Sequence, residues 1–349
     1  MSHYQRRLEA DLDRLRSSIR DMGNMVTVQL DDCATALFAC DHPLANRVTI
    51  KDAVINRQMR EIDELCYAFI ARHIPTGGLL RLVASSIRVN IQLERVGDYL
   101  VTIARCVRRL SGPPTGIVQR ELRSLVDEAS RMFNQSLNAF VTEDDALARA
   151  TGQMHAHLEH TLDDVYEHLF SDIGSKDNRE IMSLFVIFNM LKRIADQAKN
   201  LSEQTIFAAT GETKAVKKTR ILFVDQDQRC LAPMAAAIAQ RTFGDWCDAT
   251  SAGRRVGDVH EGLEAFLSDH GSDLASIERS TLPDLAQDGS PLVISLEGKL
   301  ADYFDELPFH TAGLEWPVSR PNGAGLDEAY REIAAKLHDL MDIIGEEKA

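Results

Sequence analysis

The chain has 349 residues, 44% of them hydrophobic and 26% charged, and its formal net charge is -14 at pH 7. A chain of this length usually exceeds a single small core, so we expect two domains. The negative charge argues against a protein that holds nucleic acid or an anionic membrane through its overall electrostatic field.

The cysteines and the N-terminal residues indicate the compartment. Six cysteines are scattered along the chain without a CxxC pair, which argues against a zinc ribbon or a redox dithiol. The opening residues, MSHYQRRLEADLDRL, carry charges throughout and lack the apolar stretch of a secretory signal. No run reaches the ~18 consecutive apolar residues of a membrane-spanning helix. We therefore expect a cytoplasmic protein with reduced thiols.

Three long helices are predicted for the first third of the chain. Apolar residues recur at steps of three and four over 8–37, 44–70 and 79–110, which is the spacing of one helix face. Asp41-His42-Pro43 separates the first two segments, and Ile74-Pro75-Thr76-Gly77-Gly78 separates the next two. Because proline and glycine continue a helix only at a cost in free energy, these breaks mark turns.

The helical pattern then repeats. After a segment rich in proline and glycine at 111–116, helices are predicted over about 117–143, 146–171 and 178–207. Two successive sets of three helices, about a hundred residues apart, indicate an internal duplication. We expect a pair of antiparallel three-helix bundles packed side by side. An extended coiled coil is the alternative, which the short breaks disfavour.

The pattern changes after a short basic segment at 211–219, which has the composition of a linker. Residues 221–224 and 291–296 are apolar runs typical of strands covered on both faces. Helical segments lie between them, and a last helix covers about 325–344. The predicted fold is therefore multidomain: duplicated all-α three-helix bundles, followed by a small α/β domain with a mostly parallel sheet. The predicted domains are 1–112, 117–210 and 220–345.

Two acids on the third predicted helix are four residues apart. Glu94 and Asp98 therefore lie on the same helix face, next to a stripe of apolar residues. Like charges at this spacing repel unless a cation lies between them, and carboxylate oxygens suit hard cations or iron. The alternative is that these acids form ion pairs with arginines of neighbouring helices, for which the candidates are Arg57, Arg60 and Arg81.

Residues 93–98, Leu-Glu-Arg-Val-Gly-Asp, resemble the LERIGD signature of the PhoU family, whose members regulate phosphate uptake. Met22-Gly23 late in the first helix and Pro75 before the third agree with that family in order. Residues 190–200, MLKRIADQAKN, repeat the signature in the second half. The resemblance covers about 1–210, and its duplication makes it specific.

The resemblance implies carboxylate pairs that hold metal clusters, with iron, zinc or another divalent cation at Glu94 and Asp98. Asp52 and Asn56, also four residues apart, are candidates to complete that site. Asp196 is the corresponding acid of the second half. Lys192 stands where the family has another acid, and its amine supplies a fixed positive charge in place of a metal. This departure argues against a second metal site.

The resemblance also implies a role and partners. Members of the family act as negative regulators that link a phosphate transporter to a membrane sensor kinase. The expected partners are therefore the phosphate-transporter ATPase and a membrane sensor histidine kinase, which would hold the protein at the membrane periphery. A homodimer is the expected oligomer.

Three histidines, His155, His157 and His160, lie close together in the sequence. Only His157 and His160 have the spacing of neighbours on a helix, and no further metal ligand is evident nearby. A solvated helix face is therefore the preferred interpretation over a metal site.

The stretch ILFVDQDQRCLAPMAAA begins as a buried strand and ends as a helix, a layout that commonly holds an anion on backbone N–H groups. It resembles the start of low-molecular-weight protein tyrosine phosphatases and arsenate reductases. Their pattern is a strand, then Cys, five residues, Arg, Ser, Pro, Met and a helix. Residues 251–253, 292–294 and 316–318 match later parts, so the resemblance covers about 219–345.

The residues that carry the chemistry of those enzymes are absent. Asp225 stands at the position of the nucleophile, Leu231 at the arginine that clamps the phosphate, and Arg320 at the general acid. The resemblance therefore predicts a pseudo-phosphatase module used for contact.

Two acids make the loop unsuited to a phosphate. Asp225 and Asp227 would repel a dianion, and Arg229 can offset at most one of them. Cys230 survives beside the missing arginine, and a reactive thiol is the alternative interpretation, because a helix N-terminus lowers the pKa of a thiol. The neighbouring acids oppose that effect.

The sequence thus predicts a cytoplasmic regulator of phosphate uptake and phosphate-responsive signalling that acts as a protein adaptor. One alternative is a metal-binding protein built on the carboxylate cluster. Another is a residual phosphatase in which Asp225 forms an acyl phosphate. The sequence leaves open which partner binds, which metal is held and what the loop at 225–231 recognises.

Overall fold

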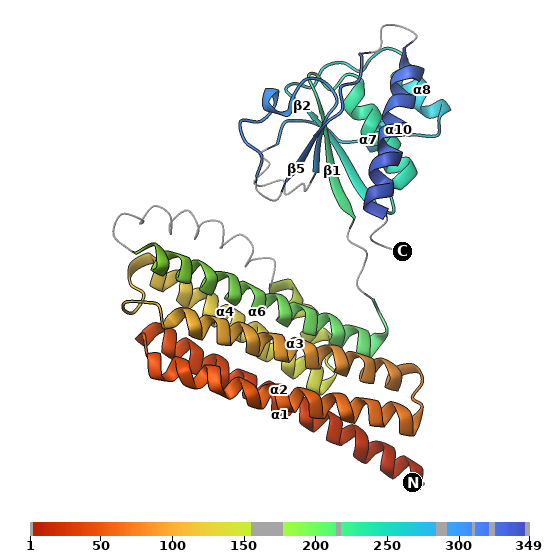
Figure 1. The fold of residues 1–349 in the computed structure, drawn as a ribbon. Coiled ribbons are helices and arrows are strands. Elements are labelled where there is room, and N and C mark those ends of the chain that lie inside the picture. The colour runs from red at the N-terminus through yellow and green to blue at the C-terminus, as the bar shows by residue number, and fades with distance from the viewer. Residues whose placement is uncertain are drawn as a thin grey trace. The chain divides into compact units, whose positions relative to one another are not determined.

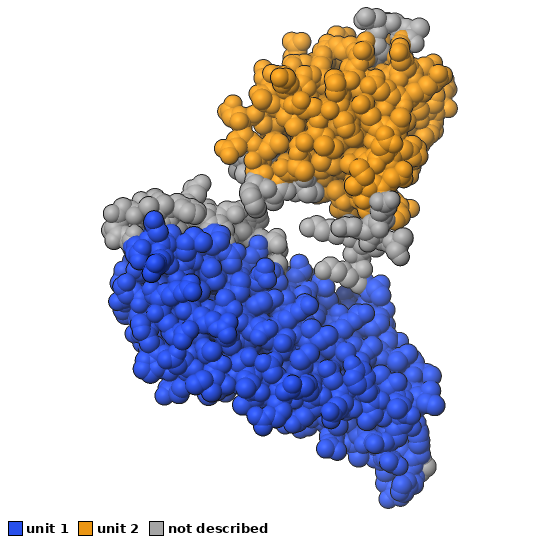
Figure 2. All heavy atoms as spheres, viewed as in Figure 1, with its two compact units in different colours: residues 1–214 blue, residues 215–349 orange. Residues whose placement is uncertain are grey.

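The computed structural model describes residues 3–154, 177–213, 218–283, 292–308, 311–320 and 325–345. The chain divides into two compact units, Met1–Lys214 and Ala215–Ala349, shown in blue and orange in Figure 2.

Long helices make up the first unit (Figure 1). They are α1 (His3–Ala39), α2 (His42–His73), α3 (Gly77–Val107), α4 (Gly116–Thr142) and α6 (Asn178–Thr210). Each follows a predicted helix closely. Residues 145–154 are also helical, and the rest of the helix predicted over 146–171 lies outside the described residues, as do His155, His157 and His160.

The predicted turns use ordinary capping chemistry. Asp41 caps α2, because its side chain accepts a 2.9 Å hydrogen bond from the backbone N–H of Leu44, and Pro43 occupies the first turn. At the other end of α2, Ile74 adopts a left-handed conformation with φ 45° before Pro75. These caps end one helix and start the next within a few residues, so that α1, α2 and α3 run antiparallel.

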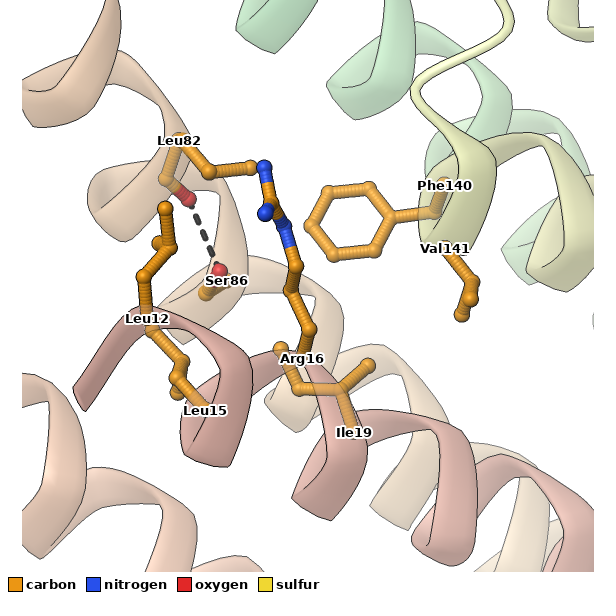
Figure 3. Close-up of a pocket in the computed structure, with 8 residues that line it drawn as sticks. All are labelled: Leu12, Leu15, Arg16, Ile19, Leu82, Ser86, Phe140 and Val141. Atoms are coloured by element: carbon orange, nitrogen blue, oxygen red, sulfur yellow. Dashed lines mark hydrogen bonds between the residues drawn. The ribbon is translucent and has the colours of Figure 1, made fainter. Parts of the chain in front are cut away.

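The helices of both repeats share one hydrophobic core. Figure 3 shows a place where the first repeat meets α4 of the second: Leu12, Leu15 and Ile19 of α1 and Leu82 and Ser86 of α3 lie beside Phe140 and Val141 of α4. Arg16 of α1 reaches across the same contact and pairs with Glu143 at the end of α4. The two predicted bundles therefore form a single compact unit.

The second unit contains a five-stranded sheet in which all the described pairings are parallel, as predicted. The strand order is β3-β2-β1-β4-β5, and the strands are β1 (Thr219–Asp225), β2 (Cys247–Gly253), β3 (Arg279–Thr281), β4 (Leu292–Ser295) and β5 (Ala312–Glu315).

Helices cover one face of this sheet, and they are α7 (Leu231–Phe243), α8 (Leu263–Asp269) and α10 (Leu326–Gly345). Ile221 and Phe223 of β1 point into that layer, whereas Leu222 and Val224 point into a smaller cluster with Tyr303 on the other face. Because side chains alternate along a strand, β1 is buried on both sides.

The topology places the candidate site. The strand order reverses at β1, since β2 lies on one side of it and β4 on the other. Loops that follow parallel strands at such a point diverge and leave a crevice at the carboxyl ends of the strands. The loops after Asp225 and Ser295 are therefore the natural position for a ligand or a contact.

None of the helices in the described ranges combines the length and the apolar character needed to cross a lipid bilayer.

Candidate functional sites

An acidic cluster lies where α2 packs on α3. Glu94 is half-buried and Asp98 is exposed, and both lie on α3 as the spacing predicted. Asp52 comes from α2 and is half-buried. A Cβ built on Gly97 would lie 3.5 Å from Asp52 Oδ1, so the α2 carboxylate faces α3 between the two acids. The structure thus brings together three side chains that the sequence placed on two helices.

Electrostatic repulsion marks this cluster. Burial raises the pKa of Glu94, and the charges of Asp98 and Asp52 raise it further. Burial and the charge of Asp98 likewise raise the pKa of Asp52, against the effect of a 2.8 Å hydrogen bond from Asn56 Nδ2 to Asp52 Oδ2. Asp52 Oδ1 is buried and has no hydrogen-bond partner among the described residues. The positive charges of Arg95 and Arg105 oppose these shifts only in part, so Asp52 Oδ1 is an unpartnered acceptor that a cation would stabilise.

The arginines proposed as alternative partners, Arg57, Arg60 and Arg81, form no ion pair with Glu94 or Asp98 in the described part of the chain. Arg81 packs instead against Gly211 at the end of α6. The ion-pair interpretation of the two acids is therefore wrong for these partners.

The side chains as they lie do not form a finished metal centre. In the part of the chain that the structure describes, no group of three or more His, Cys, Asp or Glu side chains is arranged to hold one ion. An ion held by all three of these carboxylates would therefore require their side chains to change rotamer, with water completing the coordination.

The second repeat carries the equivalent positions on α6. Residues 191–196 read Leu-Lys-Arg-Ile-Ala-Asp, so Lys192 and Asp196 correspond to Glu94 and Asp98. Both are half-buried, and the Arg193 guanidinium beside them lies 5.8 Å from the ring centre of Tyr99 on α3. A fixed ammonium thus replaces one carboxylate of the pair.

In the second unit, Asp225 ends β1 and is almost completely buried, with an exposed fraction of 2%. Its Oδ1 accepts a 2.6 Å hydrogen bond from the backbone N–H of Gln228, and its Oδ2 accepts a 2.9 Å hydrogen bond from the backbone N–H of Ala232 in the first turn of α7. Burial, the largest effect, raises the pKa of Asp225, and these two hydrogen bonds oppose the shift. Asp225 is therefore compatible with the layout of an anion-binding loop, because its carboxylate accepts hydrogen bonds from the N–H groups of that loop.

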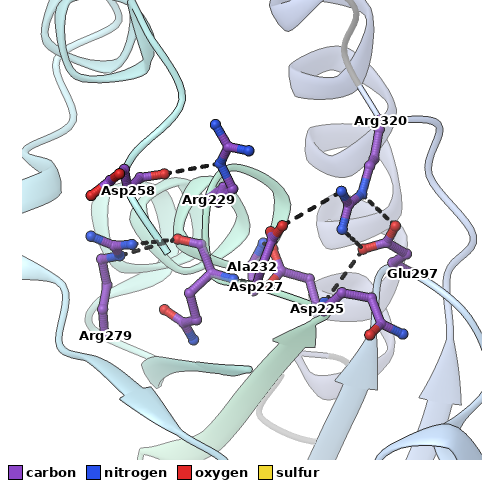
Figure 4. Close-up of polar contacts among 10 residues, drawn as sticks. Asp225, Asp227, Arg229, Ala232, Asp258, Arg279, Glu297 and Arg320 are labelled. Carbon is purple, nitrogen blue, oxygen red and sulfur yellow. Dashed lines mark hydrogen bonds and ion pairs between the residues drawn. The ribbon is translucent and has the colours of Figure 1, made fainter. Parts of the chain in front are cut away.

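Asp227 lies nearby and is also buried. Arg320 reaches it from the segment after β5, with 3.5 Å between Nη1 and Asp227 Oδ2 (Figure 4). The same guanidinium contacts both oxygens of Glu297, which follows β4, and its Nη2 donates a 2.7 Å hydrogen bond to Glu297 Oε2. The residue at the lost general-acid position is therefore the cation of this site.

Arg229 bonds to a backbone carbonyl of a neighbouring loop. Its Nε donates a 3.1 Å hydrogen bond to the carbonyl of Asp258, and its side chain points away from Asp225 and Asp227 in Figure 4. The sequence allowed Arg229 to offset at most one of the two acids, and in the structure Arg320 is the arginine that pairs with Asp227.

Cys230 and Leu231 are buried where α7 begins. Burial raises the pKa of the Cys230 thiol to about 12, and the charges of Asp225 and Asp227 add to the shift. Because only a thiolate is a good nucleophile, this geometry disfavours a reactive Cys230. Leu231 packs in the hydrophobic core and offers no charge for an anion.

Two residues of this site were missed at the sequence level. Glu297 follows a predicted buried strand directly, and the carboxyl ends of neighbouring parallel strands meet at one edge, so a signal was present. Arg279 donates to the carbonyl of Gln228 from Nε at 3.1 Å and from Nη2 at 2.7 Å. Its position in a three-residue edge strand gave no signal in the sequence.

The first unit is similar to proteins of a known family. The family described as the PhoU domain matches residues 19–107 and 122–205, which confirms the predicted duplication. The chain is 34% identical over 218 residues to the phosphate-specific transport system accessory protein PhoU homolog of Pseudomonas putida, covering 60% of this chain and 83% of that protein. The crystal structure of PhoU from Pseudomonas aeruginosa matches with 29% identity and a TM-score of 0.55, over 58% of this chain and 99% of that one.

A solved arsenate reductase in its phosphate-binding state also matches, over 37% of this chain and 99% of its own length, with 21% identity and a TM-score of 0.32.

Proposed function

Because the chain belongs to the PhoU family, we propose that it is a regulator of phosphate uptake that restrains transport as an accessory protein. The observation that carries this proposal is the match of both helical repeats to one family, together with the coverage of 83% of a phosphate transport accessory protein. The net charge of -14 supports protein partners rather than nucleic acid.

The partners proposed are the ATPase of a phosphate transporter and a membrane sensor histidine kinase, with the chain itself as a homodimer. Binding to these proteins would keep the chain at the membrane periphery through its partners. Such an adaptor acts by docking, so its effect depends on folded surfaces and not on turnover.

The test is to capture the full-length protein from cells grown with high and with low phosphate, and to measure phosphate uptake in cells that lack it. We expect a transporter ATPase or a sensor kinase to be captured in amounts that change with phosphate, and uptake to rise when the chain is absent. Unchanged uptake together with capture of neither partner would exclude the proposal.

For the second unit, we propose a phosphatase-like module without catalytic activity that serves for contact. Three observations support this: the nucleophile position is a buried acid, Asp225, the clamp position is a core residue, Leu231, and the acid position is a paired cation, Arg320. Both oxygens of Asp225 already accept hydrogen bonds, which opposes the alternative in which it attacks phosphorus.

Hydrolysis of p-nitrophenyl phosphate by the purified full-length protein tests this assignment, with Asp225→Ala as the matched variant. We expect no turnover above the buffer rate for either protein. Turnover by the wild type that Asp225→Ala abolishes would instead establish the residual phosphatase.

At the acidic cluster of α2 and α3, we propose a site for iron, zinc or another divalent cation, held by Glu94, Asp98 and Asp52. Its support is the buried, unpartnered Asp52 Oδ1 and the mutual repulsion that raises the pKa of Glu94 and of Asp52. A bound cation would supply positive charge between two helices and so stabilise their packing. Asp196 is the weaker candidate, because Lys192 already places a positive charge next to it.

Metal content measured on the purified protein tests this site. We expect the metal bound per chain to fall in Glu94→Gln and to remain in Asp196→Asn. A larger loss in Asp196→Asn would move the site to the second repeat. If Glu94→Gln loses its metal while phosphate uptake and partner capture stay unchanged, the alternative function, a metal-binding protein, is favoured.

A further inference from the structure

The connection between β1 and α7 has the arrangement that holds anions. A strand ends at Asp225, a tight turn follows, and α7 begins at Leu231 with N–H groups that have no acceptor inside the helix. The helix has 13 residues, so its aligned peptide dipoles favour negative charge at this end.

The negative charge at this position comes from the chain itself. The Asp225 carboxylate spans the turn, because one oxygen accepts from the N–H of Gln228 at 2.6 Å and the other from the N–H of Ala232 at 2.9 Å. With an exposed fraction of 2%, the side chain is inside the loop and not at its rim.

A third N–H group of the loop is also taken by an acid. The N–H of Gln226 donates a 3.3 Å hydrogen bond to Glu297 Oε2. The Arg320 guanidinium, which an entering anion would seek, is already shared by Glu297 and Asp227. An oxyanion would therefore have to displace one carboxylate and approach two others.

The turn is held in this form by contacts outside the helix. Gln228 has φ 57°, which is uncommon for a residue with a side chain, and its carbonyl accepts two hydrogen bonds from Arg279. Gly253 of β2 lies against it, since a Cβ built there would be 2.9 Å from the Asp225 carbonyl oxygen. The loop conformation is thus fixed without any added ligand.

We propose that the Asp225 carboxylate is a built-in anion that occupies the anion-binding position of its own loop and closes it to phosphate and similar oxyanions. The N–H groups of the loop therefore stay bonded to carboxylates of the chain itself at all phosphate concentrations. A regulator of phosphate uptake with this loop would present a constant surface there and would receive its phosphate signal elsewhere.

The test is amide hydrogen exchange, measured by mass spectrometry on peptides that cover residues 225–232 of the full-length protein, with and without inorganic phosphate. In the wild type, we expect slow exchange that phosphate does not change. In Asp225→Gly, which removes the carboxylate, we expect exchange of these amides to become at least about tenfold faster without phosphate, because their acceptors are lost. Added phosphate should slow it again.

A second variant distinguishes the loss of the carboxylate from a general folding defect. Asp225→Asn keeps one acceptor oxygen and the size of the side chain, so we expect a smaller acceleration that phosphate also reverses. Asp227→Asn is the matched control, because it removes a neighbouring charge and leaves the two Asp225 hydrogen bonds in place. It should exchange as the wild type does.

Three results would overturn the proposal. The first is slower exchange of the wild-type loop when phosphate is added. The second is wild-type exchange in both Asp225 variants without phosphate. The third is faster exchange in those variants that phosphate does not reverse, since the vacated position would then bind no anion. The regulatory role is tested separately, by partner capture and uptake.

Discussion

Arg320 and Glu297 connect the segment after β5 to the loop after β4 through a two-pronged contact. Arg320 Nη2 donates to Glu297 Oε2 at 2.7 Å, and its Nε contacts the other oxygen of the same carboxylate. A bidentate pair of this kind adds geometric specificity as well as energy to the contact. Because Arg320 also reaches Asp227, it is the charge that lets two acids lie close together at the end of the sheet.

Arg320→Ala should therefore destabilise the second unit. Arg320 is half-exposed, so the pair itself contributes about 1 kcal/mol or less, but the change also leaves the buried Asp227 without a cation. Both tryptophans, Trp246 and Trp316, lie in this unit, so tryptophan fluorescence during urea unfolding reports on it alone. Arg254→Ala removes an exposed arginine from the same unit and is the control. Equal unfolding midpoints for the two variants would contradict the prediction.

Gly23→Ala should destabilise the first unit by about 1–3 kcal/mol, the usual cost of overpacking a core. A Cβ at position 23 of α1 would lie 3.0 Å from Leu137 Cγ of α4 and closer still to its methyl groups. Urea unfolding followed by the helical circular dichroism signal measures the effect. Leu137→Ala makes room for the methyl group, so the double variant should lose less than the sum of the two single changes.

Gly152→Ala is the matched control for this experiment. It lies in a helix of the same unit, and a Cβ built there meets nothing within 4 Å. The change should be neutral or stabilising by up to about 1 kcal/mol, because alanine favours helix over glycine. If Gly23→Ala and Gly152→Ala change the free energy of unfolding by the same amount, the contact between Gly23 and Leu137 does not limit the packing of α1 on α4.

The helices and the sheet class were predictable because their signal is periodic and local. The step of three and four along 79–110 predicted α3, and the four-residue spacing of Glu94 and Asp98 placed both acids on one face. That Asp52 faces Gly97 was not predictable, because it depends on how α2 rotates against α3. For the same reason the pairing of Asp227 with Arg320, 93 positions further along the chain, could not be predicted, and the nearby Arg229 bonds to a backbone carbonyl instead.

Glu94→Gln should stabilise the metal-free protein at neutral pH. Burial and neighbouring charges raise the pKa of Glu94 and of Asp52, so each binds its proton more tightly in the folded chain than in the unfolded chain. Stability then falls as the pH rises from the ordinary carboxyl pKa through the raised one. Replacing the Glu94 carboxylate should therefore raise the free energy of unfolding at neutral pH by up to about 1 kcal/mol, because Glu94 is only half-buried and solvent screens its charge.

The measurement is urea unfolding of metal-free wild type and Glu94→Gln across acid to neutral pH, followed by circular dichroism. The advantage of the variant should shrink toward about pH 3, where the carboxyls of both states are largely protonated. Glu61→Gln, an exposed acid of α2, is the control and should show no such trend. A variant less stable than the wild type at neutral pH would mean that Glu94 has a cationic partner in the folded protein.

Iodoacetamide should modify Cys40 first and leave Cys230 unmodified in the native protein. Cys40 is the one cysteine of the six that is not buried, whereas Cys230 is buried and its pKa is raised to about 12 by burial and by Asp225 and Asp227. The pKa of Cys33 and of Cys66 is raised to about 12 as well, mainly by burial. Since the thiolate is the reacting form, all three should react only when the protein unfolds.

Mass spectrometry of peptides taken during mild alkylation at slightly alkaline pH gives the order of reaction. A sample unfolded in urea is the control, in which all six cysteines should be modified at similar rates. Modification of Cys230 as fast as that of Cys40 in the folded protein would show a thiolate at the start of α7. The acids beside it would then have to be protonated or displaced, and the closed loop described above would be wrong together with the pKa of Cys230.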